Sequence, residues 1–268
     1  METIRLASAK ELDIEKTFEC GQCFRWNAND KGVYTGVVGR YLAEVETVDN
    51  EVYITSDAPA EMWADYFDLA TDYAAVSADF TGEYLHKCID YGMGIRILRQ
   101  DSWEALCSFI ISQCNNITRI KGIVERLCEQ FGDKCEANGV GYYTFPSAER
   151  LAALRPSDLS GIRAGYRAEY IIAAARAVTT GELDLDVLKT CDYREAIKTL
   201  RQIRGVGEKV ANCVVLFGLY HMEAFPIDVW MKRALKEHFP ADFDPTSLGA
   251  YAGLAQQYIF YYSRSGGK

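Results

Sequence analysis

The sequence predicts an α+β fold in which an N-terminal antiparallel β-sheet domain is followed by an all-helical domain. Segments rich in β-branched and aromatic residues gather between residues 17 and 55, which favours strands. Beyond about Tyr91 the apolar residues recur every three or four positions, which favours helices. No internal repeat or low-complexity linker interrupts the chain. We therefore expect a sheet-containing domain over residues 1–90 and a helical domain over residues 91–268.

The N-terminal domain is predicted to contain an antiparallel meander. Its strands are expected over Gly32–Gly39, Tyr41–Thr47 and Glu51–Thr55, and strand structure is expected to begin at about Thr17. Short segments such as Val48-Asp49-Asn50 separate the strands and suit hairpin turns. From residue 60 onward the alternation is lost and the pattern turns helical.

The second domain is predicted to be helical throughout. Ile117, Ile120 and Val124 lie on one helical face, and Asn116 precedes them as a candidate N-cap. Short breaks that contain Gly, Pro or Asp separate the further helices. These are expected over Ser147–Leu154, Ala168–Val178, Tyr193–Gln202, Glu208–Leu219, Val229–His238 and Leu248–Tyr262.

The charge is unevenly distributed. A net charge of −9 argues, taken alone, against a nucleic-acid partner. Residues 1–90 hold 18 acidic and 7 basic side chains, however, whereas residues 91–268 hold 20 acidic and 22 basic ones. Nucleic acid would therefore meet a local surface of the second domain, with modest affinity and a shallow salt dependence.

The cysteines indicate a reducing environment. There are nine, an odd and scattered set, which favours buried free thiols over a disulfide framework. Cys20-Gly-Gln-Cys23 has the spacing of a redox pair or half a zinc site, but no second pair follows it, so we expect no metal. No membrane span or secretory signal is recognised, and we expect a cytoplasmic protein, nucleoid-associated if the source is a prokaryote.

The most informative stretch is a glycine-containing turn between two predicted helices. One helix ends near Gln202, Gly205 and Gly207 permit close backbone approach, and a second helix starts near Glu208. The N–H groups of such a helix start favour an anion, for which a DNA phosphate is one candidate. An ordinary helical turn is the alternative. The helix–hairpin–helix would span about residues 192–219.

A lysine and an aspartate follow the turn. Lys209 lies in the first turn of the second helix and Cys213 lies four residues on, hence on the same face. A loop over about residues 220–230 leads through Pro226 to Asp228, which suits a helix N-cap. A capping carboxylate at a cleft can also stabilise developing positive charge.

A hairpin that ends in lysine, followed by Pro-x-Asp-x-Trp, resembles the helix–hairpin–helix DNA glycosylase superfamily. The lysine is typical of its bifunctional branch. The resemblance implies that Lys209 attacks the sugar C1′, expels the base and forms a Schiff base, after which β-elimination cleaves the strand. An amine is nucleophilic only when neutral, so burial or helix-start dipoles are expected to favour that form. Asp228 would stabilise oxocarbenium character at the sugar.

Two segments resemble the part of 8-oxoguanine DNA glycosylases that holds the extruded base. Gly21 opens a Gly-Gln-x-Phe-Arg-Trp signature, which implies that its carbonyl accepts the N7–H that oxidation adds to guanine. Phe24 and Trp26 are interpreted as core residues. In the last helix, Gln256 and Phe260 lie four residues apart on one face. The resemblance implies that Gln256 meets the base edge and that Phe260 and Cys213 sandwich the base.

Two further segments resemble the part that replaces the extruded base. Asn115, Asn116 and Arg119 match, and Arg119 would read the orphaned cytosine, with a solvated helix charge as the alternative. Cys114 departs from the asparagine of many members. Further on, Tyr166 would be the wedge in the base stack and Arg167 a second reader. A place for Tyr166 in a domain interface is the alternative reading.

The sequence therefore predicts a bifunctional glycosylase and AP lyase that excises 8-oxoguanine from duplex DNA as a monomer. Trp230 departs from the histidine of animal members and would contact a phosphate or shape the pocket. No cofactor is expected to be required, although the resemblance allows a monovalent cation at the carbonyls of Arg201, Ile203 and Val206. The alternatives are a monofunctional glycosylase for alkylated or deaminated bases and a non-enzymatic DNA-binding module.

Overall fold

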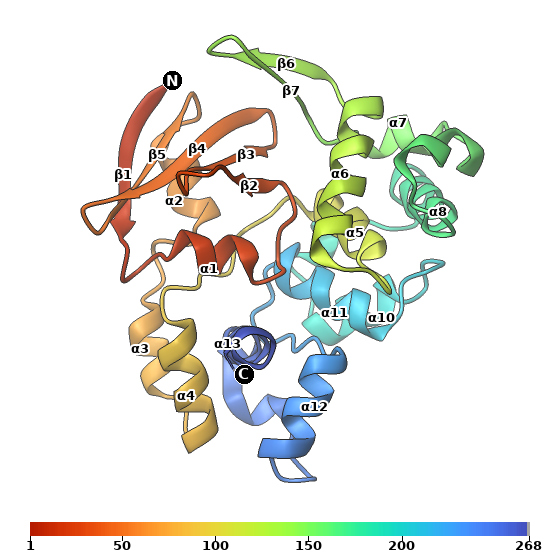
Figure 1. The fold of residues 1–268 in the computed structure, drawn as a ribbon. Coiled ribbons are helices and arrows are strands. Elements are labelled where there is room, and N and C mark those ends of the chain that lie inside the picture. The colour runs from red at the N-terminus through yellow and green to blue at the C-terminus, as the bar shows by residue number, and fades with distance from the viewer. Residues whose placement is uncertain (267–268) are drawn as a thin grey trace.

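A five-stranded antiparallel sheet forms one end of the molecule in the computed structural model, which describes residues 1–266 (Figure 1). Its strand order is β1-β5-β4-β3-β2. The turn between β4 and β5 has Asp49 and Asn50 at φ +50° and +64°, a conformation that these side chains tolerate. The three predicted strands are confirmed, and β1 and β2 extend the sheet. The strands are β1 (Glu2–Ser8), β2 (Trp26–Ala28), β3 (Tyr34–Val38), β4 (Tyr41–Val48) and β5 (Glu51–Ser56).

Two helices pack with the sheet and enclose an aromatic core. They are α1 (Ile14–Glu19) and α2 (Ala60–Tyr66). The ring of Trp26 stacks on Phe18 at 4.4 Å between centroids. The expectation of strand structure from Thr17 was wrong, because the Asp13 side chain accepts from the Lys16 N–H and caps α1, which runs on to Glu19.

The second region is built mainly from helices that share one continuous apolar core. The predicted helices are confirmed with boundaries shifted by a few residues. The longer ones are α4 (Glu83–Gly92), α5 (Ser102–Ile111), α6 (Ile117–Phe131), α8 (Arg167–Thr179), α10 (Tyr193–Leu200), α11 (Glu208–Phe217), α12 (Val229–His238) and α13 (Ala252–Ser265). The shorter ones are α3 (Tyr73–Ala78), α7 (Ala148–Ala152), α9 (Leu185–Leu188) and the 3₁₀ segments Pro156–Ile162 and Pro245–Tyr251.

Two expectations for this region were wrong. A β-hairpin of β6 (Lys134–Ala137) and β7 (Val140–Tyr143) interrupts it, turning at Asn138 and Gly139 with φ of +50° and +75°. The helix expected to start at Leu248 instead begins with a 3₁₀ segment and reaches α13 only after Gly249, whose φ of +73° breaks the helical path.

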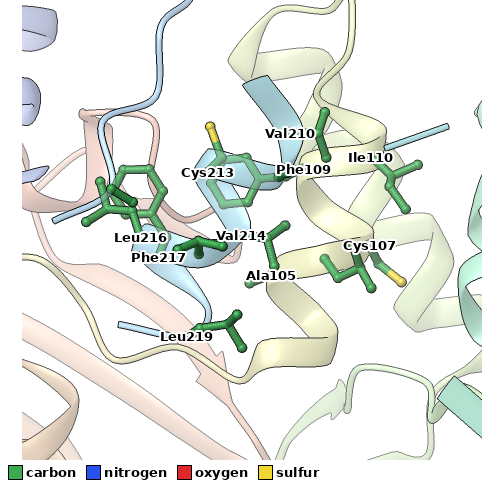
Figure 2. Packing of buried hydrophobic residues seen from close by; sticks show 14 of the residues in the cluster. Ala105, Cys107, Phe109, Ile110, Val210, Cys213, Val214, Leu216, Phe217 and Leu219 are labelled. Atoms are coloured by element: carbon green, nitrogen blue, oxygen red, sulfur yellow. The ribbon is translucent and has the colours of Figure 1, made fainter. Parts of the chain in front are cut away.

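The packing of α5 against α11 forms the centre of the helical core (Figure 2). Phe109 and Phe217 stack there at 5.4 Å between centroids. Helix α13 packs closely against the same region at Gly253. Any larger residue there would clash, since a Cβ would lie 2.3 Å from the Leu216 side chain. The chain after α1 also joins this core through Cys20 and Phe24. It therefore brings a loop of the sheet region to the side of α13.

Trp26 and Phe24 are both buried, which confirms their interpretation as core residues.

Within residues 1–266, no helix combines the length and the apolar character that crossing a bilayer requires.

Candidate active site and DNA interface

Lys209 lies at the start of α11, whose N-cap is Gly207. Its amine, Nζ, donates to the Ser112 hydroxyl at 3.3 Å and lies 5.5 Å from the centre of the Phe109 ring. The side chain is only partly exposed. The sequence reading missed Ser112 and Phe109 as neighbours of the amine, although both lie in the segment that contains Asn115 and Arg119.

Asp228 caps α12, as predicted. Its Oδ1 accepts the Met231 N–H at 2.9 Å. Its second carboxylate oxygen accepts no hydrogen bond from residues 1–266. Pro226 is buried two residues before it and fixes the approach of the loop to the helix. One oxygen therefore holds the helix start while the other stays free for a ligand.

The buried thiol of Cys213, on α11, is influenced by the charges of both Lys209 and Asp228. Burial raises the pKa of its thiol, the nearby positive charge of Lys209 opposes that rise, and the negative charge of Asp228 adds to it. Lys209 on α11 and Asp228 at the start of α12 thus both contribute to the direction of this pKa shift, with opposite signs. Figure 2 shows Cys213 on α11, above the Phe109 ring.

Gly21 lies against the last helix. Its φ is +83°, and a Cβ there would lie 3.5 Å from the Phe260 ring and 3.6 Å from Ile117. The structure thus brings together Gly21 and Phe260, two residues 239 positions apart that were assigned to one base pocket. Among the described residues, nothing donates a hydrogen bond to the Gly21 carbonyl.

Gln256, one turn before Phe260, is only 4% exposed. Its carboxamide oxygen is buried and accepts no hydrogen bond in the part of the chain that the structure describes. Leaving such an acceptor unpaired costs about 1–3 kcal/mol, so a ligand that donates to it would recover that energy.

The residues assigned to the orphaned base surround the start of α6. Asn116 is the N-cap, since its side chain accepts from the Arg119 N–H at 2.9 Å. Asn115 donates to the Ile111 carbonyl at 3.3 Å. Arg119 is exposed, and Tyr166 is 51% exposed. The exposure of Tyr166 is compatible with a wedge and does not support its alternative place in a domain interface.

Arg167 is arranged differently from a base reader. It is only 4% exposed, and its guanidinium donates to the carbonyls of Gln113, Cys114 and Ala164. Cys114 itself is exposed, at a φ of +49°. In this state Arg167 holds the loop before α6 in place, and it could reach a base only by giving up these bonds.

The hairpin is tied to the same loop. Gly205 has a φ of +88°, and a Cβ there would lie 2.1 Å from the Tyr170 ring, so only glycine fits. The Gln113 side chain donates to its carbonyl at 3.0 Å. Trp230, at the start of α12, is 38% exposed and lines a cavity of about 350 Å³ together with Arg264.

Comparison with known proteins gives two family matches that together cover most of the chain. Residues 5–106 match the 8-oxoguanine DNA glycosylase N-terminal domain. Residues 107–253 match the HhH-GPD superfamily of base excision DNA repair proteins.

Three relatives illustrate the likeness. The structure of MBOgg1 with a low-affinity DNA ligand is 38% identical in sequence and has a TM-score of 0.91. The match covers 99% of this chain and 96% of that chain. The Clostridium acetobutylicum 8-oxoguanine glycosylase/lyase, with duplex DNA containing cytosine opposite 8-oxoguanine, is 34% identical with a TM-score of 0.90. The match covers 100% of this chain and 99% of that chain. A *Bacillus subtilis* DNA-3-methyladenine glycosylase is 33% identical over 208 residues, 70% of this chain and 68% of that protein.

The third relative shows that the superfamily includes enzymes named for alkylated bases. The match of residues 5–106 favours the 8-oxoguanine branch, because that family model describes the N-terminal domain of 8-oxoguanine DNA glycosylases. The chain belongs to the 8-oxoguanine DNA glycosylase family of the HhH-GPD superfamily.

Proposed function

We infer that this protein is a bifunctional 8-oxoguanine DNA glycosylase and AP lyase of base excision repair, acting on double-stranded DNA. The family matches and the full-length likeness to an 8-oxoguanine glycosylase/lyase support that activity. The observation that carries the mechanism is the partly exposed Lys209 amine at the start of α11, together with the Asp228 carboxylate at the start of α12, which caps that helix through one oxygen.

Lys209 is the proposed nucleophile. Its neutral amine attacks the sugar C1′, the bond from C1′ to N9 breaks, and the base leaves with that electron pair and a proton. The C1′–O4′ bond then breaks, O4′ takes a proton from water, and the nitrogen, which keeps its second proton, forms a protonated imine with C1′. Loss of a C2′ proton expels the 3′ phosphate oxygen and cleaves the strand. The free carboxylate oxygen of Asp228 stabilises positive charge at the sugar during the first step.

The proposed base pocket uses Gly21, Gln256, Phe260 and Cys213. The free Gly21 carbonyl accepts the N7–H of 8-oxoguanine, which guanine lacks. The unpaired Gln256 carboxamide oxygen accepts from the N–H groups on the base edge. Phe260, beside Gly21, and Cys213, beside Lys209, are the proposed walls of the pocket.

The proposed DNA contacts fall into two groups. The hairpin amides at Gly205 and Gly207, with Trp230, meet phosphates and position the duplex. Asn115, Asn116, Arg119, Tyr166 and Arg167 fill and read the space left by the extruded base, Arg167 only after its carbonyl bonds open. We propose that the enzyme acts as a monomer.

Three further points remain proposals. A monovalent cation would lie at the carbonyls of Arg201, Ile203 and Val206, in the turn that contains Gly205 at a φ of +88°. The division at residue 90 is the proposed boundary between the sheet-containing and the helical domain.

All nine cysteines are free and six are buried, which supports a reducing, cytoplasmic compartment.

A panel of duplexes tests the activity. Each carries 8-oxoguanine, 3-methyladenine or uracil opposite each of the four bases, and products are separated with and without alkali. We expect excision of 8-oxoguanine opposite cytosine, with strand cleavage before alkali is added. Excision that cleaves the strand only after alkali would favour a monofunctional enzyme, and binding without excision would favour a DNA-binding module.

A further inference from the structure

Four successive backbone carbonyls, from the last residue of α1 onward, differ in their hydrogen bonds. Arg264 donates to the carbonyl of Glu19, and the Gln257 side chain donates to that of Cys20 at 2.8 Å. The Gln100 side chain donates to the carbonyl of Gln22 at 2.8 Å. Among the described residues, only the carbonyl of Gly21 accepts nothing in this stretch.

Two of the three donors belong to α13. Gln257 and Arg264 are seven residues apart, which is close to two helical turns and places them on one face. Gln257 is 2% exposed, so its hydrogen bond is shielded from water. An Arg264 Nη1 lies 3.7 Å from the position of a Cβ on Gly21. Helix α13 therefore holds the loop at the two residues before the free carbonyl, and Gln100 holds it at the residue after.

The same helix carries Phe260, which lies between the two donors in sequence and whose ring is 3.5 Å from the position that a Cβ on Gly21 would occupy. The distance between the free carbonyl and the Phe260 ring is thus set by bonds within one small unit. The unit joins a loop of the sheet region to α13, two parts of the chain that are far apart in sequence.

We propose that Gln257 and Arg264 are positioning residues that fix the Gly21 carbonyl for the recognition of 8-oxoguanine. This proposal rests on the function proposed above. The lesion presents a donor at N7, whereas guanine presents a lone pair that the carbonyl repels. Because a hydrogen bond weakens steeply outside a narrow range of distance and angle, discrimination by one proton requires a carbonyl that does not move.

The simpler explanation is that the two side chains only fasten α13 to the sheet region. The lyase reaction separates the two explanations, because a preformed abasic site uses Lys209 but has no base for Gly21 to meet. Loss of positioning affects base excision alone, whereas loss of general integrity affects both reactions.

Gln257→Met and Arg264→Met remove the donors while keeping much of the side-chain volume. For each variant, kcat/KM is measured for 8-oxoguanine excision, and kcat for cleavage at a preformed abasic site. We expect excision to fall about 10-fold and abasic-site cleavage to stay within about twofold. Arg264→Lys, which keeps one charged donor, should recover part of the excision.

Tyr258→Phe is the matched control, because it removes a hydrogen bond of 3.3 Å from α13 to Ser77, outside the loop. Its excision rate should equal that of the parent protein. Equal loss of both reactions in the Gln257 and Arg264 variants, or no loss of excision, overturns the proposal. Absence of 8-oxoguanine excision in the parent protein would instead overturn the proposed function itself.

Discussion

The side of the site assigned to the lesion and the side assigned to the orphaned base are built differently. On the lesion side, side-chain donors hold the carbonyls before and after Gly21, and Gln256 is buried with an oxygen that has no hydrogen-bond partner among the described residues. On the other side, Arg119 and Tyr166 are exposed, and Arg167 is occupied by backbone carbonyls. The proposed lesion pocket is thus largely preformed, whereas the proposed reading of the opposite base requires side chains to be rearranged or ordered on DNA.

The largest effect is expected on the lesion side at Asp228. Asp228→Asn removes the charge but keeps the N-cap, because asparagine caps a helix about as well as aspartate. We expect 8-oxoguanine excision to slow about 10²- to 10³-fold with the thermal midpoint of unfolding unchanged. Single-turnover kinetics and thermal denaturation measure the two. A lower midpoint that accounts for the slower rate would show that the carboxylate serves only the helix.

A smaller loss is expected at Gly21. Gly21→Ala places a side chain at φ +83°, which costs about 1–2 kcal/mol and displaces the carbonyl. We expect an about 10-fold fall in 8-oxoguanine excision with abasic-site cleavage preserved. Gly32→Ala is the control, since Gly32 has a φ of +78° with no atom within 4 Å of a Cβ there. Equal behaviour of the two variants would refute a preformed recognition carbonyl.

A change in opposite-base preference is expected at Arg119. Arg119→Gln should lower the preference for cytosine over the other bases about 10-fold while leaving the fastest excision rate nearly unchanged. Arg150→Gln, on α7, replaces another exposed arginine and should change nothing. Excision rates against the four opposing bases measure the ratio. An unchanged ratio for Arg119→Gln would support the solvated-charge reading.

The smallest effect is expected at Tyr166. Tyr166→Ala removes the ring that would occupy the stack, and we expect binding of the lesion duplex to weaken about threefold to tenfold. Tyr166→Phe should restore it, because the ring and not the hydroxyl fills the space. Fluorescence anisotropy at fixed salt checks both variants. Weak binding by both the Ala and the Phe variant would show that the hydroxyl of Tyr166, and not its ring, makes the contact with DNA.

The sequence predicted those parts of the fold that depend on local patterns. Asn116 and Asp228 are N-caps as expected, because a cap needs only the residues beside it. The β6–β7 hairpin was missed because its strands are short and lie between amphipathic helices. Its Asn138-Gly139 turn was the available signal.

The site was predicted less completely, because its neighbours come together only in three dimensions. Family motifs named Gly21 and Phe260, and the fold brings them together. No local pattern could show that Arg167 is buried on three carbonyls, or that Arg264 reaches the end of α1. These contacts depend on packing between distant segments.

The identity of the covalent nucleophile is the most direct test of the mechanism. The protein is incubated with an 8-oxoguanine duplex and borohydride, and the trapped adduct is digested and mapped by mass spectrometry. The mechanism predicts an adduct on Lys209 that is absent in Lys209→Gln and present in Lys232→Gln, which replaces an exposed lysine on α12. An adduct on any other residue, or one that persists in Lys209→Gln, would contradict it.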